Sequence, residues 1–237
     1  MTLFASAMCC LLLTQCGTVQ NDVLIAYPDR PLLPLEQCAV IAWGVKGEHD
    51  AFHKKTSQMM LQKVNGADAV NVGTWNGYKR IAVKPGPVAV EGWVSQGQDV
   101  RATVRLQAGH EYEFLGAPYV VVDGREMTPE EAAAHASAAV TAAVPALARA
   151  PEVTQQNLKA LFYLPGMQLS SPHQALIDVI SRYKRRGLMV VRDRSTGALS
   201  TAEDAESQRL FAKFRSHIPA LLKTIDQPVI QRGPMSI

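Results

Sequence analysis

The sequence predicts an α+β protein made of an antiparallel β-sandwich, an alanine-rich connector helix and a small α/β C-terminal unit. Three observations lead to this prediction. Short apolar runs separated by tight-turn pairs fill residues 38–125, an alanine-rich run fills residues 126–152, and segments in the order strand, helix, strand, helix fill residues 153–237. The 237 residues, 47% of them hydrophobic and 19% charged, suffice for one substantial core or two small ones.

The N-terminal segment, residues 1–15, is expected to be a signal peptide. It has no charged side chain, and its apolar run is shorter than the roughly 20 residues that span a bilayer. The sequence Leu13-Thr14-Gln15-Cys16 resembles the lipobox of bacterial lipoproteins, in which the chain is cut before the cysteine and the sulfur receives a diacylglycerol. The resemblance implies that Cys16 is the lipidation site. A buried N-terminal helix with core thiols is the alternative interpretation.

Residues 16–37 are predicted to be a lipidated tether, because polar and then proline-rich sequence follows the cysteine. Gly17 stands where lipoproteins kept in the inner membrane typically carry Asp, so the resemblance implies an outer-membrane anchor facing the periplasm. Only Cys38 of the four cysteines lies in the body that follows, where a lone thiol is most often a small buried hydrophobe. The net charge of +3 is mild and indicates no nucleic-acid partner.

The sandwich is predicted from short strands that end at turn pairs. The run "CAVIAWG" at 38–44 is apolar throughout, which is typical of a strand buried on both faces. Later runs alternate apolar and polar residues and stop at the pairs Asn65-Gly66, Pro85-Gly86, Ala108-Gly109 and Asp123-Gly124. Several short strands at this spacing predict an antiparallel sandwich.

Four segments of this region carry a family resemblance. They are "KVNG" at 63–66, "VKPGPVAVEG" at 83–92, "LQAGHEYEF" at 106–114 and "YVVVDG" at 119–124. Their succession resembles the PEGA-like and related small β-sandwich domains of bacterial lipoproteins. The resemblance covers about residues 38–125 and implies a fold, but it carries no catalytic residue over to this chain.

The connector helix has a clear start signal. Thr128 is the expected N-cap, Pro129 occupies the first helical position, and Glu131 completes a capping box. An alanine-rich run with high helix propensity follows, and Pro145 should kink or end the helix.

The C-terminal unit, residues 153–237, is predicted as strand, helix, strand and helix, in the manner of a βαβ unit with one extra helix. "NLKALFYLPG" at 157–166 is the first strand, and a helix capped by Ser171 runs to Gly187. "LMVVRDRSTGALS" at 188–200 is the second strand, and a last helix is capped by Thr201.

Residues that could carry chemistry are few. His49 and His53 have the spacing of a helical zinc pair, but their segment is a loop pattern without a third ligand, so we expect no metal site and no cofactor. The aromatic side chains could line a carbohydrate or peptide groove, although packing inside the sandwich is the preferred interpretation; they are Trp43, Trp75, Tyr78, Trp93, Tyr112 and Tyr119.

A basic cluster follows the predicted helix of the C-terminal unit. Arg182, Lys184, Arg185 and Arg186 would occupy its last turn, where cations interact favourably with the helix dipole. If the four charges project outward together, they form a candidate surface for anionic lipid headgroups or cell-wall polymer.

Two classes of function stay open. The first is a noncatalytic envelope lipoprotein, held at the membrane by its N-terminal lipid, that binds an envelope protein or peptidoglycan. The second is a membrane-tethered hydrolase using residues such as His173, Asp178 or Asp193. The first is preferred, and no catalytic residue is assigned, because no nucleophile, acid–base pair or metal cluster has supporting spacing.

Overall fold

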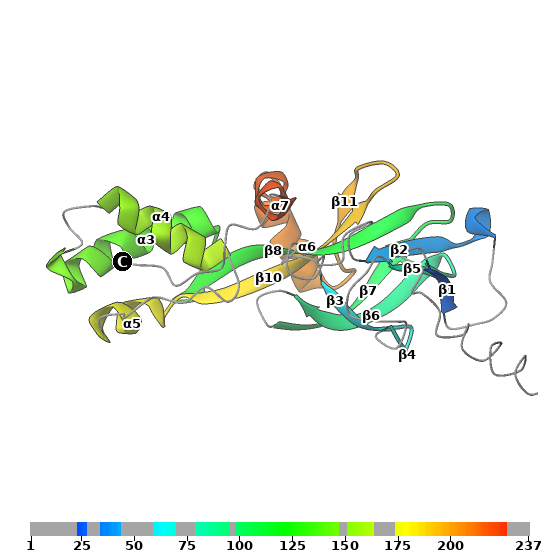
Figure 1. The fold of residues 1–237 in the computed structure, drawn as a ribbon, viewed down its shortest axis with the longest axis horizontal. Coiled ribbons are helices and arrows are strands. Elements are labelled where there is room, and N and C mark those ends of the chain that lie inside the picture. Colours follow the sequence, from blue (N-terminus) through cyan, green and yellow to red (C-terminus); the bar gives the residue numbers. More distant parts are fainter. Residues whose placement is uncertain are drawn as a thin grey trace, which may run out of the picture.

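A computed structural model describes residues 23–27, 34–43, 59–69, 79–94, 98–146, 151–163 and 174–226. Within them the chain forms two sheets and a set of helices, which confirms the α+β class (Figure 1). The larger sheet has seven strands in the order β1 (Val23–Tyr27), β5 (Lys79–Val83), β2 (Ala39–Trp43), β8 (Glu111–Val122), β10 (Lys184–Asp193) and β11 (Leu199–Ser200), with β9 (Arg125–Met127) also on β8. The smaller sheet has the order β4 (Ala67–Asp68), β3 (Met60–Val64), β6 (Gly86–Val94) and β7 (Gln98–Leu106).

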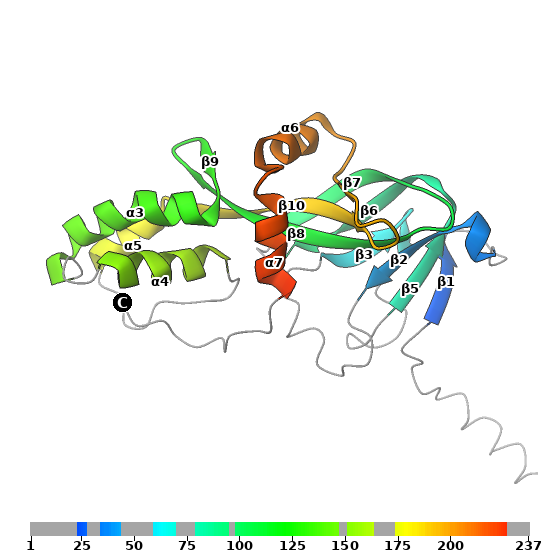
Figure 2. The same ribbon diagram turned by 90° about the horizontal axis from the view of Figure 1, so that it is seen from above.

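The helices gather in two places. At one end of the molecule lie α3 (Pro129–Ala143), α4 (Pro151–Tyr163) and α5 (Gln174–Ile180), which we call the helical head. Midway along the molecule, α6 (Ala205–Phe214) and α7 (Ile218–Asp226) lie beside β8 and β10 (Figure 2). A short 3₁₀ helix, Leu35–Gln37, precedes β2.

The antiparallel pair β8 and β10 runs along the molecule and joins its two ends (Figure 1). All ten residues of β10 are in register with β8, from Lys184 opposite Val121 to Asp193 opposite Tyr112. Strand β8 is buried at nearly every position, which explains why "EYEFLGAPYVVV" is mostly apolar instead of alternating.

Proline within this central strand is tolerated because of its register. Pro118 lies opposite Gly187, whose N–H points away from β8 and donates to the side chain of Gln98 at 3.3 Å. The pair is therefore one of the alternate pairs that exchange no ladder hydrogen bonds. The N–H that Pro118 lacks would point to the edge of β8 that faces away from β10. On that edge Pro118 lies between Phe114, which bonds to Met59, and Val120, which pairs with β9.

Three apolar clusters share this central pair of strands. The first lies between the two sheets and combines Phe114 and Met189 of the larger sheet with Val90 and Val104 of the smaller one. The second packs Leu115 and Val190 against α6 and α7. The third packs the far end of β8 against the helical head through Val120, Val122, Ala132, Ala136, Leu158 and Phe162. The strand pair thus supplies side chains to every large cluster.

Local signals in the first half of the chain are confirmed. Asn65 and Gly66 both have positive φ, at 48° and 79°, and so do Asp123 and Gly124, at 48° and 76°. These values are those of type I′ hairpin turns. The Thr128–Glu131 capping box is formed in both directions, and α3 ends at Ala143, two residues before Pro145.

Three expectations for the second half are wrong. The segment 157–166 was predicted to begin the unit as a strand, but its described part lies in helix α4, where Thr154, Leu158, Leu161 and Phe162 are buried at helical spacing. The next helix ends at Ile180 instead of Gly187, because residues from Lys184 onward pair with β8. The result is an antiparallel strand of the main sheet instead of a βαβ unit.

The last helix and the tether also differ from expectation. Asp204, not Thr201, caps α6, and a turn at residues 215–217 separates it from α7. The Thr201 hydroxyl donates instead to the carbonyl oxygen of Met189. Within the expected tether 16–37, residues Val23–Tyr27 form β1, which pairs in parallel with β5.

These contacts bear on whether residues 38–125 fold alone. The cluster between the sheets includes Met189, Val191 and Ala202 from the C-terminal part of the chain. A chain ending at residue 125 would also expose the whole edge of β8 that β10 covers. The predicted sandwich and the predicted C-terminal unit therefore share one core.

We predict that the fragment 38–125 shows no cooperative thermal unfolding by circular dichroism, whereas the full chain does. A companion chain in which an Asn-Gly turn replaces residues 122–183 keeps β10 beside β8, because Lys184 lies opposite Val121 and this pair would close the two-residue turn. It should regain a cooperative transition with a β-type spectrum. Cooperative unfolding of the bare fragment would show instead that β10 is dispensable.

Candidate functional site

The helical head contains a cleft between α3 and α4. Its volume is about 290 Å³, and its lining residues are Glu130, Ala133, Glu152, Gln155, Gln156 and Lys159. The four residues from α4 stand at positions i, i+3, i+4 and i+7, which puts them along one side of the helix. Five of these six residues have polar side chains, and the sixth, Ala133 of α3, is apolar.

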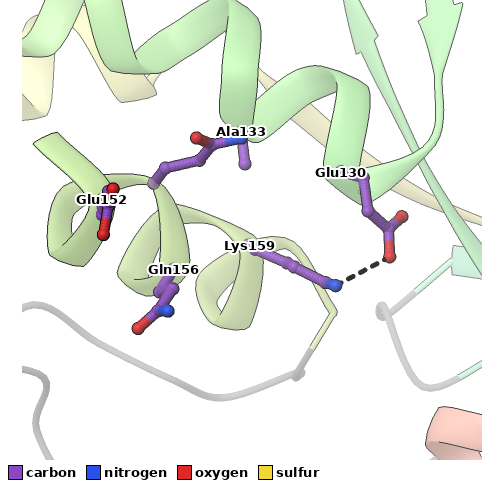
Figure 3. Close-up of a pocket in the computed structure, with 6 residues that line it drawn as sticks. Glu130, Ala133, Glu152, Gln156 and Lys159 are labelled. Carbon is purple, nitrogen blue, oxygen red and sulfur yellow. Dashed lines mark ion pairs between the residues drawn. The ribbon is translucent and has the colours of Figure 1, made fainter.

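An ion pair bridges the cleft (Figure 3). The Lys159 ammonium lies 3.1 Å from a carboxylate oxygen of Glu130, which also accepts a hydrogen bond from the Tyr163 hydroxyl. Burial would raise the pKa of Glu130, but these hydrogen bonds outweigh it, so the pKa lies below its usual value. With Glu130 and Glu152 ionised and Lys159 charged, the lining carries one net negative charge. Such a site can hydrogen-bond a polar or cationic group.

The head is joined to the sheet by Arg185. Its guanidinium donates to the Leu161 carbonyl oxygen at 3.1 Å, in the last turn of α4, where backbone carbonyls lack helical partners. Burial lowers the pKa of this guanidinium. Arg185 therefore stabilises the C-terminal end of α4 instead of facing solvent.

The four residues of the predicted basic surface are divided. Arg182 forms a 2.7 Å ion pair with Asp123, and Arg185 points beneath the helical head. Lys184 and Arg186 are exposed on the opposite side of β10, because successive strand residues point to opposite faces. The expectation that all four project outward together from a helix end is wrong, and Lys184 and Arg186 alone share an exposed face.

The two candidate catalytic residues that the structure describes lie far apart. His173 lies outside the described residues, as do His49 and His53. Asp178 is exposed on α5 and accepts a hydrogen bond from Gln174, whereas Asp193 lies at the other end of β10 from the helical head. The two carboxylates therefore belong to different ends of the molecule.

Asp193 has a partner that the sequence analysis missed. A carboxylate oxygen lies 2.7 Å from Nδ1 of His110, and the carboxylate also accepts hydrogen bonds from the Ser195 N–H and the Thr196 hydroxyl at 2.8 Å each. Burial would raise the pKa of Asp193, but the hydrogen bonds outweigh it, and the pKa is lowered. The pair joins the turns before β8 and after β10. The Asp-x-Ser-Thr-Gly pattern signals the turn, but no local signal reveals His110.

A second charged group crosses the same end of the sheet. Glu113 is only 5% exposed at its side chain and forms a 2.7 Å ion pair with Arg192, its register partner on β10. Glu111 pairs with Arg80 of β5 at 3.1 Å and with Arg194 at 2.9 Å. These charges link three strands.

Most aromatic residues of the described part pack inside. Tyr112 and Tyr119 are buried, and the Tyr112 hydroxyl accepts a hydrogen bond from the Gln107 N–H at 2.9 Å. Trp93 on β6 is half-buried. Trp43 lies in β2, and Trp75 and Tyr78 lie outside the described residues. The cleft between α3 and α4 has no aromatic residue in its lining.

The described residues include neither a cluster of metal-ligating side chains nor a membrane-spanning helix. In the described ranges no three His, Cys, Asp or Glu side chains lie together as a metal site, and Cys38 is buried and forms no disulfide. The helices described here include none that is long and apolar enough to cross a bilayer.

Glu126 ties the β8–β9 hairpin to α6. Its carboxylate accepts hydrogen bonds from Arg209 and, at 2.8 Å, from Lys213. These two bonds lower the pKa of Glu126 from about 4.5 to about 2. The ionised carboxylate is thus favoured in the folded state.

Comparison of the chain with protein families, with curated proteins and with solved structures finds no match.

We predict that Glu126→Gln weakens the acid dependence of stability. Because the folded pKa is depressed, ionised Glu126 stabilises the fold above about pH 4.5, and this contribution disappears as the pH falls toward 2. The variant should lose about 1 kcal/mol or less at pH 7 and should show a shallower decline below pH 4.5 in urea titrations. Glu91→Gln, at a 3.6 Å pair on the smaller sheet, is the control. An unchanged slope for Glu126→Gln would contradict the assignment.

Proposed function

We propose that the chain is a noncatalytic lipoprotein of the bacterial cell envelope that presents its helical head to an envelope protein or to peptidoglycan. The observation that carries this proposal is the arrangement along β8 and β10. Strand β1, the described element nearest to Cys16, lies at one end of the molecule, and α3, α4 and α5 lie at the other (Figure 1). The twelve residues of β8 span about 40 Å between them.

The anchor in this proposal is a lipid on Cys16, facing the periplasm from the outer membrane. Six residues, 17–22, would separate the lipid from β1. Fully extended they reach about 20 Å, so the sheet end would stay near the membrane while the head stays away from it.

Within this proposal, residues 38–125 form a PEGA-like β-sandwich that is completed by a strand from outside this segment. Support comes from the apolar cluster shared by the two sheets and from the hairpin turns at Asn65-Gly66 and Asp123-Gly124. Strand β10 would complete the sandwich, and α3 would serve as the connector to the head.

The noncatalytic interpretation is supported by what the ionised groups do. Glu113, Glu126 and Asp193 each hold two or more segments of chain together through the bonds described above. The hydrolase alternative has one observation in its favour, the 2.7 Å contact of His110 with Asp193. Both oxygens of that carboxylate are engaged by the adjoining turn, which favours a structural role.

We predict that Cys16→Ser abolishes membrane attachment by lipid. In cells labelled with a fatty-acid analogue, the wild type should carry label and sediment with membranes, whereas the variant should carry none. Cys38→Ser is the matched control, because Cys38 is buried and should not be acylated. Equal labelling of the wild type and Cys16→Ser would contradict the anchor.

We predict that the head cleft contacts the partner. A photo-reactive residue at Gln156 should cross-link to a discrete envelope component in cells, and Glu152→Arg should reduce that product severalfold by reversing a lining charge. A photo-reactive residue at Arg101, exposed on the smaller sheet, is the control and should give no such product. A product that is identical at both positions, or insensitive to Glu152→Arg, would contradict a role for the cleft.

A further inference from the structure

Exposed cations from two distant parts of the sequence converge beside the helical head. Lys184 lies opposite Val121, and Val121 lies opposite Glu126 of β9, so the three residues form a row across β10, β8 and β9. Arg186 lies opposite Tyr119 in the same ladder, on the same face of β10 as Lys184.

Helix α6 adjoins this face. Tyr119 packs on Phe214 with 5.7 Å between ring centroids, and Arg209 and Lys213 of α6 reach Glu126. We call Lys184, Arg186, Arg209 and Lys213 the basic surface.

The charges on this surface do not cancel. Arg209 and Lys213 share Glu126, and Arg209 also pairs with Glu206, so two carboxylates accompany four cations. Among the residues that the structure describes, Lys184 and Arg186 have no acidic partner. The Arg186 guanidinium makes a 3.3 Å contact with the Arg185 carbonyl, which leaves its charge uncompensated. The surface therefore carries two excess positive charges. The two cations without an acidic partner lie on β10, whose backbone is paired with β8.

We propose that the basic surface binds a phosphate-bearing anionic polymer. Arg186 supplies a planar set of donors suited to phosphate oxygens, and Lys184 supplies a second charge on the same strand face, two residues away. Arg209 and Lys213 add positive potential while their own bonds keep them fixed.

A polymer is favoured over membrane headgroups by position. Val121 and Lys184 lie nine residues along the ladder from Tyr112 and Asp193, or about 30 Å from that end of the sheet. Strand β1 lies at that same end. This choice between polymer and membrane rests on the proposed lipid anchor, whereas phosphate binding itself does not.

The test is binding of inorganic polyphosphate to the full chain in neutral detergent, measured by fluorescence anisotropy at low salt. Lys184→Gln combined with Arg186→Gln should weaken binding about 25-fold, because each basic side chain near an anionic surface contributes about fivefold in affinity. Neither residue holds an ion pair within the described part, so the unfolding temperature should not change. Binding should also weaken as salt rises.

The matched control removes two exposed charges elsewhere, Lys63→Gln with Arg101→Gln, on the smaller sheet. It should bind as the wild type does. Equal losses in both double variants would overturn the proposal, since only net charge would matter. Equal binding of polyphosphate and poly-glutamate would overturn the preference for phosphate. Stronger binding to detergent micelles doped with anionic phospholipid than to polyphosphate, sensitive to the same two residues, would assign the surface to the membrane instead.

Discussion

The antiparallel pairing of β8 with β10 is the interaction on which the other parts of the structure depend. It joins residues about seventy positions apart through ten register pairs, and its two faces supply side chains to all three large apolar clusters. The smaller sheet, helices α6 and α7, and the helical head contact this pair more than they contact one another. Closing such a long loop costs conformational entropy before the strands meet, so the pairing should form late relative to the local hairpins.

Signals confined to neighbouring residues correctly predicted two hairpin turns and the start of α3. Asn65-Gly66 and Asp123-Gly124 favour positive φ at both residues, which is what a type I′ turn requires. The Thr128–Glu131 capping box begins α3 because the cap and its partner are three residues apart. In each case the interaction that decides the conformation is made within a few residues.

Errors arose where distant pairing decided the conformation. The segment around Lys184–Arg186 continues a helical pattern in the sequence, yet ladder bonds to β8 hold it as a strand. Once it is a strand, alternation divides the basic residues between two faces, and Arg185 is carried under α4. The His110–Asp193 pair escaped prediction for the same reason, since its partners are 83 residues apart. The side chains of the head cleft gave no sequence signal, because they form an ordinary polar helix face until α3 is placed opposite.

Burial and pairing separate the charges that maintain this fold from those that are available to a partner. Glu113 with Arg192, and Glu126 with Arg209 and Lys213, are bound between strands or between a strand and a helix, so removing one member leaves a charge without its counterpart. Lys184 and Arg186 share the same sheet but project from exposed positions, and the ladder would form equally well with neutral side chains there. Because their charges contribute little to folding, their presence beside a cluster that is already cationic is better explained by attraction to an anion than by stability. Arg182, paired with Asp123, and Arg185, bonded to Leu161, stabilise the fold instead.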